Sequence, residues 1–241
     1  MKNILITGVS RGVGIHTASI LLENGYNVYG ISREMSNTVK NLLNRFTNKF
    51  YYYSYDLENV SDINKKIFKE FLPLDIPIHG FVNNAAYAYD DLITNANYNI
   101  LKKSFDINVF SPVIIIKYVI RNMLFNNICG SIVHVSSISV HTGYKGLSMY
   151  AASKGAIEAL SKNIAREWGE KGIRSNCVVA GFMNTDMSAK LSPEQKDRIY
   201  QRTALKKATE ISAVAETILF LLSDKSSSIT GQNIFVDSGT I

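Results

Sequence analysis

Short apolar runs alternate with amphipathic stretches along the whole chain. The apolar runs have the length and composition of buried strands, which we expect at Asn3–Thr7, Asn27–Ser32, Phe50–Tyr55, Gly80–Asn83, Ile132–Ser136, Arg174–Val179 and Asn233–Val236. The stretches between them repeat apolar residues at helical spacing and predict helices over Gly14–Asn24, Asp62–Leu72, Asn97–Asn126, Tyr150–Gly169 and Ala213–Leu222. This alternation is typical of an α/β fold in which helices cover both faces of a parallel sheet.

The chain has the size of a single domain. It holds 241 residues, of which 46% are hydrophobic and 19% are charged, so it can bury one substantial core. We therefore expect residues 1–241 to form one doubly wound, Rossmann-type sheet of about seven strands. The helix over Asn97–Asn126 is expected to bend at Pro112, because proline lacks a backbone donor. The apolar residues in 180–208 show neither helical nor strand periodicity, which is typical of a lid or a binding loop.

The charge balance excludes few partners. A net charge of +6 and an isoelectric point near 9.1 are compatible with an anionic ligand. The basic residues are scattered, however, and no block of five or six occurs. This distribution disfavours nucleic acid and fits a phosphorylated cofactor as well as it fits a solvated basic surface.

Cysteine usage and hydropathy indicate a compartment. Cys129 and Cys177 are the only cysteines, and they offer neither metal-ligand spacing nor a disulfide framework. We expect both to be buried, reduced thiols in a cytoplasmic protein without a metal site. The longest run of large apolar residues, Ile218–Leu222, is too short to cross a membrane, and we expect no segment that spans one.

A glycine-rich turn follows the first predicted strand. The sequence Thr7-Gly8-Val9-Ser10-Arg11-Gly12-Val13-Gly14 leads directly into a helix. Glycines let backbone N–H groups approach a pyrophosphate, and the helix N-terminus stabilises its charge. The spacing is Gly-x-x-x-Gly-x-Gly, since Thr17 occupies the last position of the commoner Gly-x-Gly-x-x-Gly. Its place between a strand and a helix predicts a dinucleotide site at Gly8, Ser10, Arg11, Gly12, Val13 and Gly14.

The end of the second predicted strand bears on the choice of cofactor. NAD sites usually place an acid there for the ribose 2′-hydroxyl, whereas a basic residue accommodates a 2′-phosphate. Here Ser32 stands where an acid is expected and Arg33 follows it, while Arg11 adds a second guanidinium. We therefore expect a preference for NADP(H). NAD(H) stays an alternative, in which Glu34 supplies the acid or Arg33 points to solvent.

Three side chains form a candidate catalytic group. Tyr150 and Lys154 lie one helical turn apart in Tyr-Ala-Ala-Ser-Lys, so they share a helix face. A nearby ammonium favours the phenolate and lowers the pKa of the tyrosine toward the range of a general acid or base. Ser137 ends a predicted strand, where its hydroxyl can hydrogen-bond a substrate oxygen. The pair alone is a weak motif, since Tyr-x-x-x-Lys is common on helices.

In combination, these motifs resemble the short-chain dehydrogenase/reductase family over nearly the whole chain. The turn is similar to the family's Thr-Gly-x-x-x-Gly-x-Gly, Asn83-Asn84-Ala85-Ala86 to its Asn-Asn-Ala-Gly, and Ser228–Gln232 to the C-terminal segment of the 3-oxoacyl-(acyl-carrier-protein) reductase subgroup. The resemblance implies catalytic roles for Asn108, Ser137, Tyr150 and Lys154. It also implies cofactor contacts from Ser32, Arg33, Asp56, Leu57, Asn83, Ala85, Tyr150, Lys154, Gly181, Met183 and Thr185.

Two positions depart from the family pattern. Ala86 replaces a glycine and adds a methyl group near the expected cofactor ribose. Ala180 replaces a proline before Gly181, which removes a fixed φ at the start of the substrate loop. Neither change removes a functional group, so we expect altered cofactor binding rather than its loss.

The resemblance implies a mechanism. Tyr150 would donate a proton to a ketone oxygen, Ser137 would share that oxygen, and Lys154 would bind the nicotinamide ribose and lower the pKa of the tyrosine. Asn108 would hold a water that links Lys154 to solvent. The expected reaction is NADPH-dependent reduction of a ketone to a secondary alcohol, or its reverse.

The substrate is left open by the sequence. The predicted substrate loop, 182–207, mixes basic residues with Met187 and Leu191, which lie one helical turn apart and either line an apolar pocket or pack the loop onto the body. A 3-oxoacyl thioester on an acidic carrier protein would need a basic mouth. The segment Asn126–Cys129 is uncharged, which weakens this reading, and Lys171 is a second candidate cation. A sugar-derived or other small ketone or alcohol stays an alternative.

Two further expectations concern function and assembly. The protein could instead be a non-catalytic nucleotide-binding regulator on the same fold, although the full catalytic set favours an enzyme. The long helices over Asn97–Asn126 and Tyr150–Gly169 are apolar on more than one face. The family resemblance implies that they pack against another subunit in a dimer or tetramer.

Overall fold

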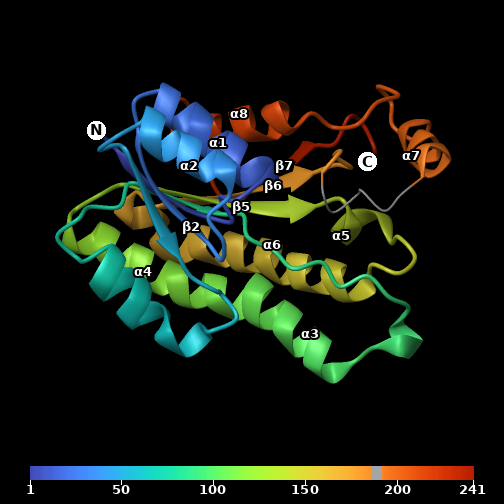
Figure 1. Cartoon of the computed structure of the whole chain (residues 1–241), viewed down its shortest axis with the longest axis horizontal. Helices are drawn as coiled ribbons and strands as arrows, with labels where there is room; N and C mark the ends of the chain where they lie inside the picture. Colours follow the sequence, from blue (N-terminus) through green and yellow to red (C-terminus); the bar gives the residue numbers. More distant parts are fainter. Residues whose placement is uncertain (186–191) are drawn as a thin grey trace.

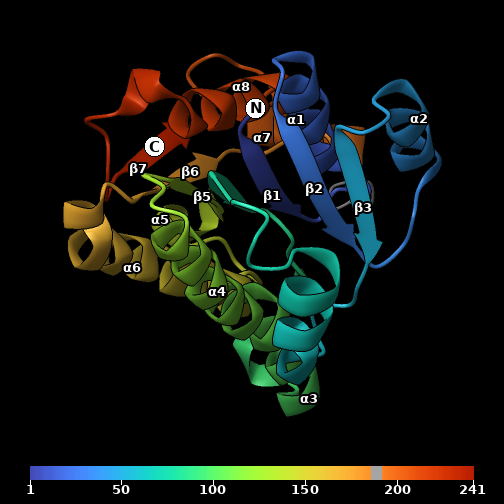
Figure 2. The ribbon, with the colours of Figure 1, turned by 90° about the vertical axis from the view of Figure 1, so that its left-hand side faces the viewer.

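A seven-stranded parallel sheet forms the centre of the computed structural model, which describes residues 1–185 and 192–241 (Figures 1 and 2). The strands follow the order β3-β2-β1-β4-β5-β6-β7, and every neighbouring pair is parallel. Their bounds are β1 Asn3–Thr7, β2 Asn27–Ser32, β3 Phe50–Ser54, β4 Gly80–Asn83, β5 Ser131–Ser137, β6 Arg174–Ala180 and β7 Asn233–Val236. The expected α/β architecture is confirmed, and β1, β2, β4 and β7 have the bounds that the sequence predicts.

Helices cover both faces of this sheet (Figure 2). One face packs against α1, α2 and α8 through an aliphatic core, and the other packs against α4, α6 and a π-helical segment through a second core richer in aromatic rings. The α-helices are α1 Gly12–Glu23, α2 Asn37–Arg45, α3 Tyr98–Phe105, α4 Ser111–Phe125, α5 Ser139–Thr142, α6 Ser148–Trp168, α7 Pro193–Tyr200 and α8 Ile211–Leu222; the π-helical segment is Asn64–Phe71. Because β1 lies between β2 and β4, the chain changes direction across the sheet there, and the carboxyl ends of β1 and β4 form the switch point at which doubly wound folds bind ligands.

The long predicted helix is continuous but not uniform. A π-helical segment, Asp106–Phe110, joins α3 to α4, and the Ser111 N–H bonds to the Asp106 carbonyl. This π-helical segment lies just before Pro112, which has no N–H to donate. The irregular part of the helix is therefore slightly earlier in the chain than the bend expected at Pro112. Tyr98–Phe125 is also long and apolar enough to cross a membrane by length and composition alone, which was not anticipated from the sequence. Of its most apolar window, 56% is buried within the protein, as in a core helix.

Three further findings differ from the sequence predictions. Helix α2 is missed because only Val39 and Leu42 bury apolar side chains on it. Helix α7 lies inside the segment expected to be irregular, and a capping box between Ser192 and Gln195 begins it. Cys129 is exposed, contrary to expectation, whereas Cys177 is buried. Cys129 precedes β5 rather than belonging to it, so its side chain does not enter the sheet.

Candidate active site

The glycine-rich turn joins β1 to α1 at the carboxyl edge of the sheet. Gly8 and Gly12 have φ values of +78° and +58°, a region that side chains rarely adopt. A Cβ on Gly14 would lie 2.2 Å from the Gly8 carbonyl oxygen, so the turn closes on itself only with glycine there. A Cβ on Gly12 would instead meet nothing within 4 Å. The turn is therefore tight on its inner side and open at Gly12, the shape that a backbone cradle for a phosphate needs.

The N-terminus of α1 is electrostatically suited to an anion. Arg11 is its N-cap residue, with extended backbone, and the Arg11 side chain makes no capping hydrogen bond to the helix. The first turn also contains no acidic residue. Backbone N–H groups and the helix dipole thus favour negative charge at this point. The glycine-rich turn and the start of α1, which the sequence assigns to a nicotinamide dinucleotide, therefore fit the pyrophosphate of that cofactor.

Asn84 braces the turn from β4. Its side-chain amide donates to the carbonyls of Thr7 at 2.9 Å and Gly8 at 3.1 Å. The Thr7 hydroxyl accepts in return from the backbone N–H groups of Asn84 and Ala85, both at 3.2 Å. The Asn-Asn-Ala-Ala motif therefore joins the loop after β4 to the loop after β1.

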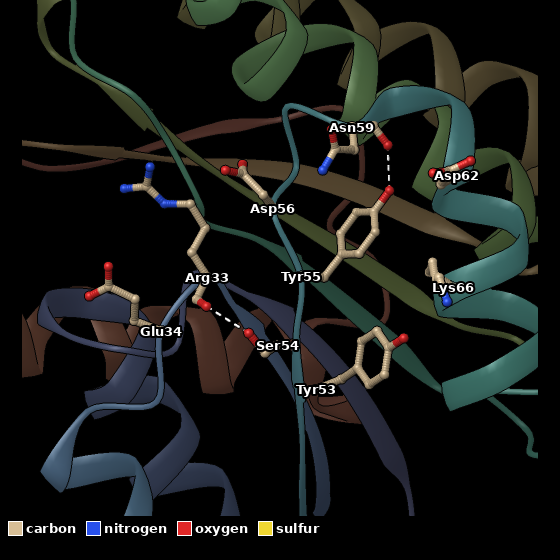
Figure 3. Close-up of a pocket in the computed structure, with 9 residues that line it drawn as sticks. All are labelled: Arg33, Glu34, Tyr53, Ser54, Tyr55, Asp56, Asn59, Asp62 and Lys66. Atoms are coloured by element: carbon tan, nitrogen blue, oxygen red, sulfur yellow. Dashed lines mark hydrogen bonds between the residues drawn. The ribbon is translucent and has the colours of Figure 1, made fainter.

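A cleft of about 600 Å³ lies where β2 and β3 end (Figure 3). Arg33, Glu34 and Asp56 line it, and the Arg33 side chain has Glu34 on one side and Asp56 on the other. Hydroxyl groups fix the backbone that carries Arg33: Ser54 Oγ donates to the Arg33 carbonyl at 2.6 Å. Ser32 Oγ is occupied as well, since it donates to the Glu34 carbonyl at 3.0 Å.

Tyr52 completes this arrangement on β3. Its hydroxyl donates to the Ser32 carbonyl at 3.1 Å and lies 3.2 Å from Ser32 Oγ. Ser32 itself is buried. The structure thus places the expected 2′-position residues together, with Arg33 exposed and Ser32 held below it.

Lys154 is almost fully buried, like Asn108. Its side chain is on α6, only 4% of the residue is exposed, and Nζ donates to the Val135 carbonyl of β5 at 2.8 Å. Nζ also lies 5.7 Å from the centre of the Tyr150 ring, as the four-residue spacing predicts. The lysine therefore ties α6 to the strand that ends in Ser137 while its ammonium stays beside the tyrosine.

The pKa values of the pair differ from the expectation. Burial raises the pKa of Tyr150 well above its usual value, and the charge of Asp90 raises it further. Burial also lowers the pKa of Lys154 to about 8, against a smaller opposing influence of Cys177. The expected lowering of the Tyr150 pKa by Lys154 is thus not found in this structure, because removal of both groups from water dominates.

Asn108 holds together the parts of the site that surround Tyr150. Its Nδ2 donates to the Tyr87 carbonyl and to Ser153 Oγ, both at 2.9 Å, and its Oδ1 accepts from the Tyr87 N–H at 2.7 Å. Ser153 Oγ in turn donates to the Tyr150 carbonyl at 2.7 Å. Both amide hydrogens of Asn108 therefore have partners within the protein, and the side chain connects the β4 loop to the catalytic helix.

Ser137 and the segment after β6 complete the site. Ser137 ends β5, and its hydroxyl accepts from the Ser139 N–H at 3.2 Å. The Gly181 N–H bonds to the Val236 carbonyl at 2.9 Å, and a Cβ on Gly181 would come within 2.3 Å of Thr209 Oγ1. Met183 packs against the aliphatic core, and Thr185 follows. Met187 and Leu191 of the predicted substrate loop lie outside the described residues.

Two buried polar groups of this region were missed by the sequence interpretation. His134 is fully buried next to Val135, and its ring nitrogens lie 3.3 Å from Asn83 Nδ2 and 3.2 Å from Ser175 Oγ. Burial lowers its pKa to about 3, with a contribution from Lys154, so it is a neutral member of the core. Glu158 is the second, and its position one turn after Lys154 was the available signal.

Comparison with known proteins supports the assignment of a family. The profile described as "Enoyl-(Acyl carrier protein) reductase" matches residues 8–240. L-xylulose reductase of Caenorhabditis elegans is 33% identical over 240 residues, which is 99% of this chain and 95% of that protein. The 3-oxoacyl-(acyl-carrier-protein) reductase FabG of Chlamydia pneumoniae is 32% identical, with coverage of 99% and 96%. Carbonyl reductase (NADPH) 2 of Sus scrofa is 32% identical, with coverage of 98% and 94%.

A solved structure agrees with the fold. The structure of 4-hydroxyisoleucine dehydrogenase complexed with NADH superposes with a TM-score of 0.92 and 24% sequence identity. The match covers 100% of this chain and 98% of the other. The likeness therefore extends across the sheet, both helical layers and the described parts of the segment after β6.

Proposed function

The chain belongs to the short-chain dehydrogenase/reductase family, and we propose that it reduces a ketone to a secondary alcohol with NADPH, or catalyses the reverse reaction. The observation that carries this proposal is the Tyr150–Lys154 pair on α6, packed against the end of β5 at the edge of the sheet where the glycine turn lies. The carbonyl reductases among its relatives support the same class of reaction.

The protein residues have separate tasks in this reaction. The bound nicotinamide supplies the hydride, and the chain supplies orientation and a proton. Tyr150 donates that proton to the carbonyl oxygen, and Ser137 holds the same oxygen by a hydrogen bond. Burial raises the pKa of Tyr150, which keeps the phenol protonated but makes it a weaker acid. Lys154 holds the nicotinamide ribose, and Asn108 positions α6 because its amide hydrogens are already bonded within the protein.

The preference for NADPH rests on the adenosine end of the site. Arg33 is exposed at the cleft and presents a guanidinium there, and no carboxylate stands at position 32. Arg11 is exposed in the glycine turn and adds a second cation. Charge-assisted bonds to a phosphate are stronger than those to a hydroxyl, so a 2′-phosphate gains more here. Glu34, the alternative acid for the ribose of NAD, and Asp56 lie on opposite sides of Arg33 (Figure 3).

The substrate is proposed as a small ketone or a 3-oxoacyl thioester. Helix α7 carries the exposed Arg198, and Arg202 and Lys206 follow it, so an acidic carrier protein would meet positive charge there. Lys171 does not serve this purpose within one chain. It follows the C-terminus of α6, about 30 Å from Ser148 at a rise of about 1.5 Å per residue. A keto-sugar is the competing substrate, since L-xylulose reductase is as similar as the carrier-protein reductases.

Two observations support the proposed assembly and the proposed compartment. Phe110 and Val113 stand exposed on the helix Tyr98–Phe125, at 49% and 38%, which supports packing against a second copy in a dimer or tetramer. Cys129 and Cys177 are both free thiols, as suits the reducing cytoplasm.

Ketone-dependent oxidation of NADPH tests the proposed function. A panel of 3-oxoacyl thioesters, keto-sugars and simple ketones should reveal at least one substrate, with a higher kcat/KM for NADPH than for NADH. A preference for NADH would contradict the cofactor assignment. Tight NADPH binding without turnover of any ketone would favour the non-catalytic nucleotide-binding protein instead.

A further inference from the structure

A buried carboxylate that the reaction does not use lies next to the catalytic residues. Glu158 is on α6, two turns after Tyr150 and one after Lys154, and only 6% of it is exposed. A carboxylate removed from water is costly unless hydrogen bonds satisfy its oxygens. Glu158 meets this requirement through donors from three separate elements.

The three donors come from the strand, the short helix and the edge strand around the site. Ser136 Oγ of β5 donates to Oε1, and Asn233 Nδ2 of β7 donates to Oε2 at 2.6 Å. His141 Nε2 of α5 lies 3.1 Å from Oε2. One carboxylate therefore connects four elements, since it also belongs to α6.

The short helix α5 is the element whose position matters for the reaction. It begins two residues after Ser137, and the Ser139 N–H bonds to Ser137 Oγ. The backbone N–H groups of His141 and Thr142 both bond to the Ile138 carbonyl, so these bonds close the turn. The His141 ring also packs edge-on against Phe235 of β7, with centroids 5.0 Å apart. Fixing His141 thus fixes the segment that carries Ser137.

Electrostatic tuning of Lys154 does not explain this carboxylate. The causes of the shift in the pKa of Lys154 are burial, which lowers it, and Cys177, which opposes the change; Glu158 is not among them. The contacts of Glu158 indicate a positioning role instead. Glu158 lies on the helix that carries Tyr150, and it binds Ser136 before Ser137 and His141 after it.

We propose that Glu158 is a positioning residue that holds the Ser137–Thr142 segment against α6, so that the Ser137 and Tyr150 hydroxyls meet at one substrate oxygen. The catalytic part of this inference rests on the proposed reductase function. Its structural part, the fixing of the segment, can be measured without any substrate.

The test uses an isosteric change and its rescue in the full chain. In Glu158→Gln, one oxygen still accepts from Ser136, but the new amide nitrogen cannot accept from Asn233 Nδ2 or His141 Nε2. Both charge-assisted bonds are lost, and Asn233 can pair with the glutamine only by turning its amide to present Oδ1 in a weaker neutral bond. In Glu158→Gln/Asn233→Asp, the glutamine amide donates to the new carboxylate and the contact is restored in reverse. Glu167→Gln is the matched control, since Glu167 is exposed on the same helix.

Three quantities separate positioning from general stability. We expect Glu158→Gln to lower kcat about tenfold and to leave the Kd for NADPH, measured by fluorescence titration, within about twofold. Amide hydrogen exchange at His141 and Thr142 should accelerate about tenfold. The double variant should recover most of both effects, and Glu167→Gln should show neither.

Several outcomes would overturn the inference. Unchanged exchange at His141 and Thr142 in Glu158→Gln would overturn it whatever the activity. Weakened NADPH binding together with accelerated exchange across the whole sheet would show a role in overall stability. If exchange responds as expected but the wild-type protein reduces no ketone, the segment is fixed as inferred and the proposed function fails instead.

Discussion

The two ends of the site are built in different ways. At the catalytic end, Lys154 and Asn108 are almost fully buried, and each bonds to backbone from another element. At the adenosine end, Arg33 and Glu34 are exposed, and only the backbone that carries them is fixed, by hydroxyls of β2 and β3. Packing thus determines the catalytic geometry, whereas exposed and replaceable side chains determine which cofactor is preferred.

This contrast has a consequence for mutations. A change at the catalytic end should abolish turnover, while a change at the adenosine end should alter the ratio between two cofactors and leave the chemistry intact. Effects should also become smaller as the altered group lies further from the reacting atoms or from the 2′-phosphate.

The largest effect is expected for Tyr150→Phe. Loss of the proton donor should lower kcat by about a thousandfold, the usual range for a positioned general acid. The ring and its packing stay, so NADPH binding measured by fluorescence should change less than about twofold. Turnover at the wild-type rate would show that another group donates the proton.

A smaller effect is expected for Arg33→Ser. Removing a guanidinium from the 2′-phosphate should lower kcat/KM for NADPH about 10- to 100-fold, while the value for NADH changes little. Steady-state kinetics with both cofactors measures this ratio. An equal loss with both cofactors would place Arg33 at a part of the site that does not distinguish them.

A third variant tests whether backbone bracing matters at the adenosine end. Tyr52→Phe removes the hydroxyl that bonds to Ser32, and we expect a roughly threefold rise in KM for NADPH, in line with one neutral hydrogen bond. Tyr51→Phe is the matched control, because the Tyr51 hydroxyl on the same strand bonds instead to the Asn48 carbonyl. Similar KM values for NADPH in both variants would show that the bond from Tyr52 to Ser32 does not affect cofactor binding.

The smallest effect concerns stability against pH. Burial lowers the pKa of Lys154 to about 8, below its usual value of 10.5, so the unfolded state binds more protons above pH 8. Stability should therefore rise between about pH 8 and 9. Above pH 9 the raised pKa of Cys177, about 12, acts in the opposite direction, because the unfolded thiol loses its proton first. Urea unfolding across this window should show a rise that Lys154→Met abolishes; an equal rise in that variant would assign it to another group.

Much of the fold and of the site could be predicted from local sequence. Strands buried on both faces give continuous apolar runs, and the glycine turn and the Tyr150–Lys154 spacing are local patterns. Their relative placement agrees with those predictions. The sequence also showed the capping residues of α7, Ser192 and Gln195, but a segment without apolar periodicity concealed the helix.

The remaining features depend on contacts between distant segments. Glu158 binds residues as far away in sequence as Asn233, and no local pattern indicates such a cluster. The pKa of Tyr150 depends on how deeply the whole fold buries it and on Asp90, so the lysine spacing alone predicted the wrong direction. Exposure of Cys129 likewise depends on where β5 begins.

Deuterium transfer tests the central claim most directly. NADPH with both hydrogens on the nicotinamide C4 replaced by deuterium would be incubated with wild-type protein and a ketone from the panel. The alcohol formed would be analysed by mass spectrometry and NMR. We expect one deuterium on the carbinol carbon of the product, formed by wild-type protein and not by Tyr150→Phe. An alcohol without deuterium, or equal product from the variant, would contradict hydride transfer at this site.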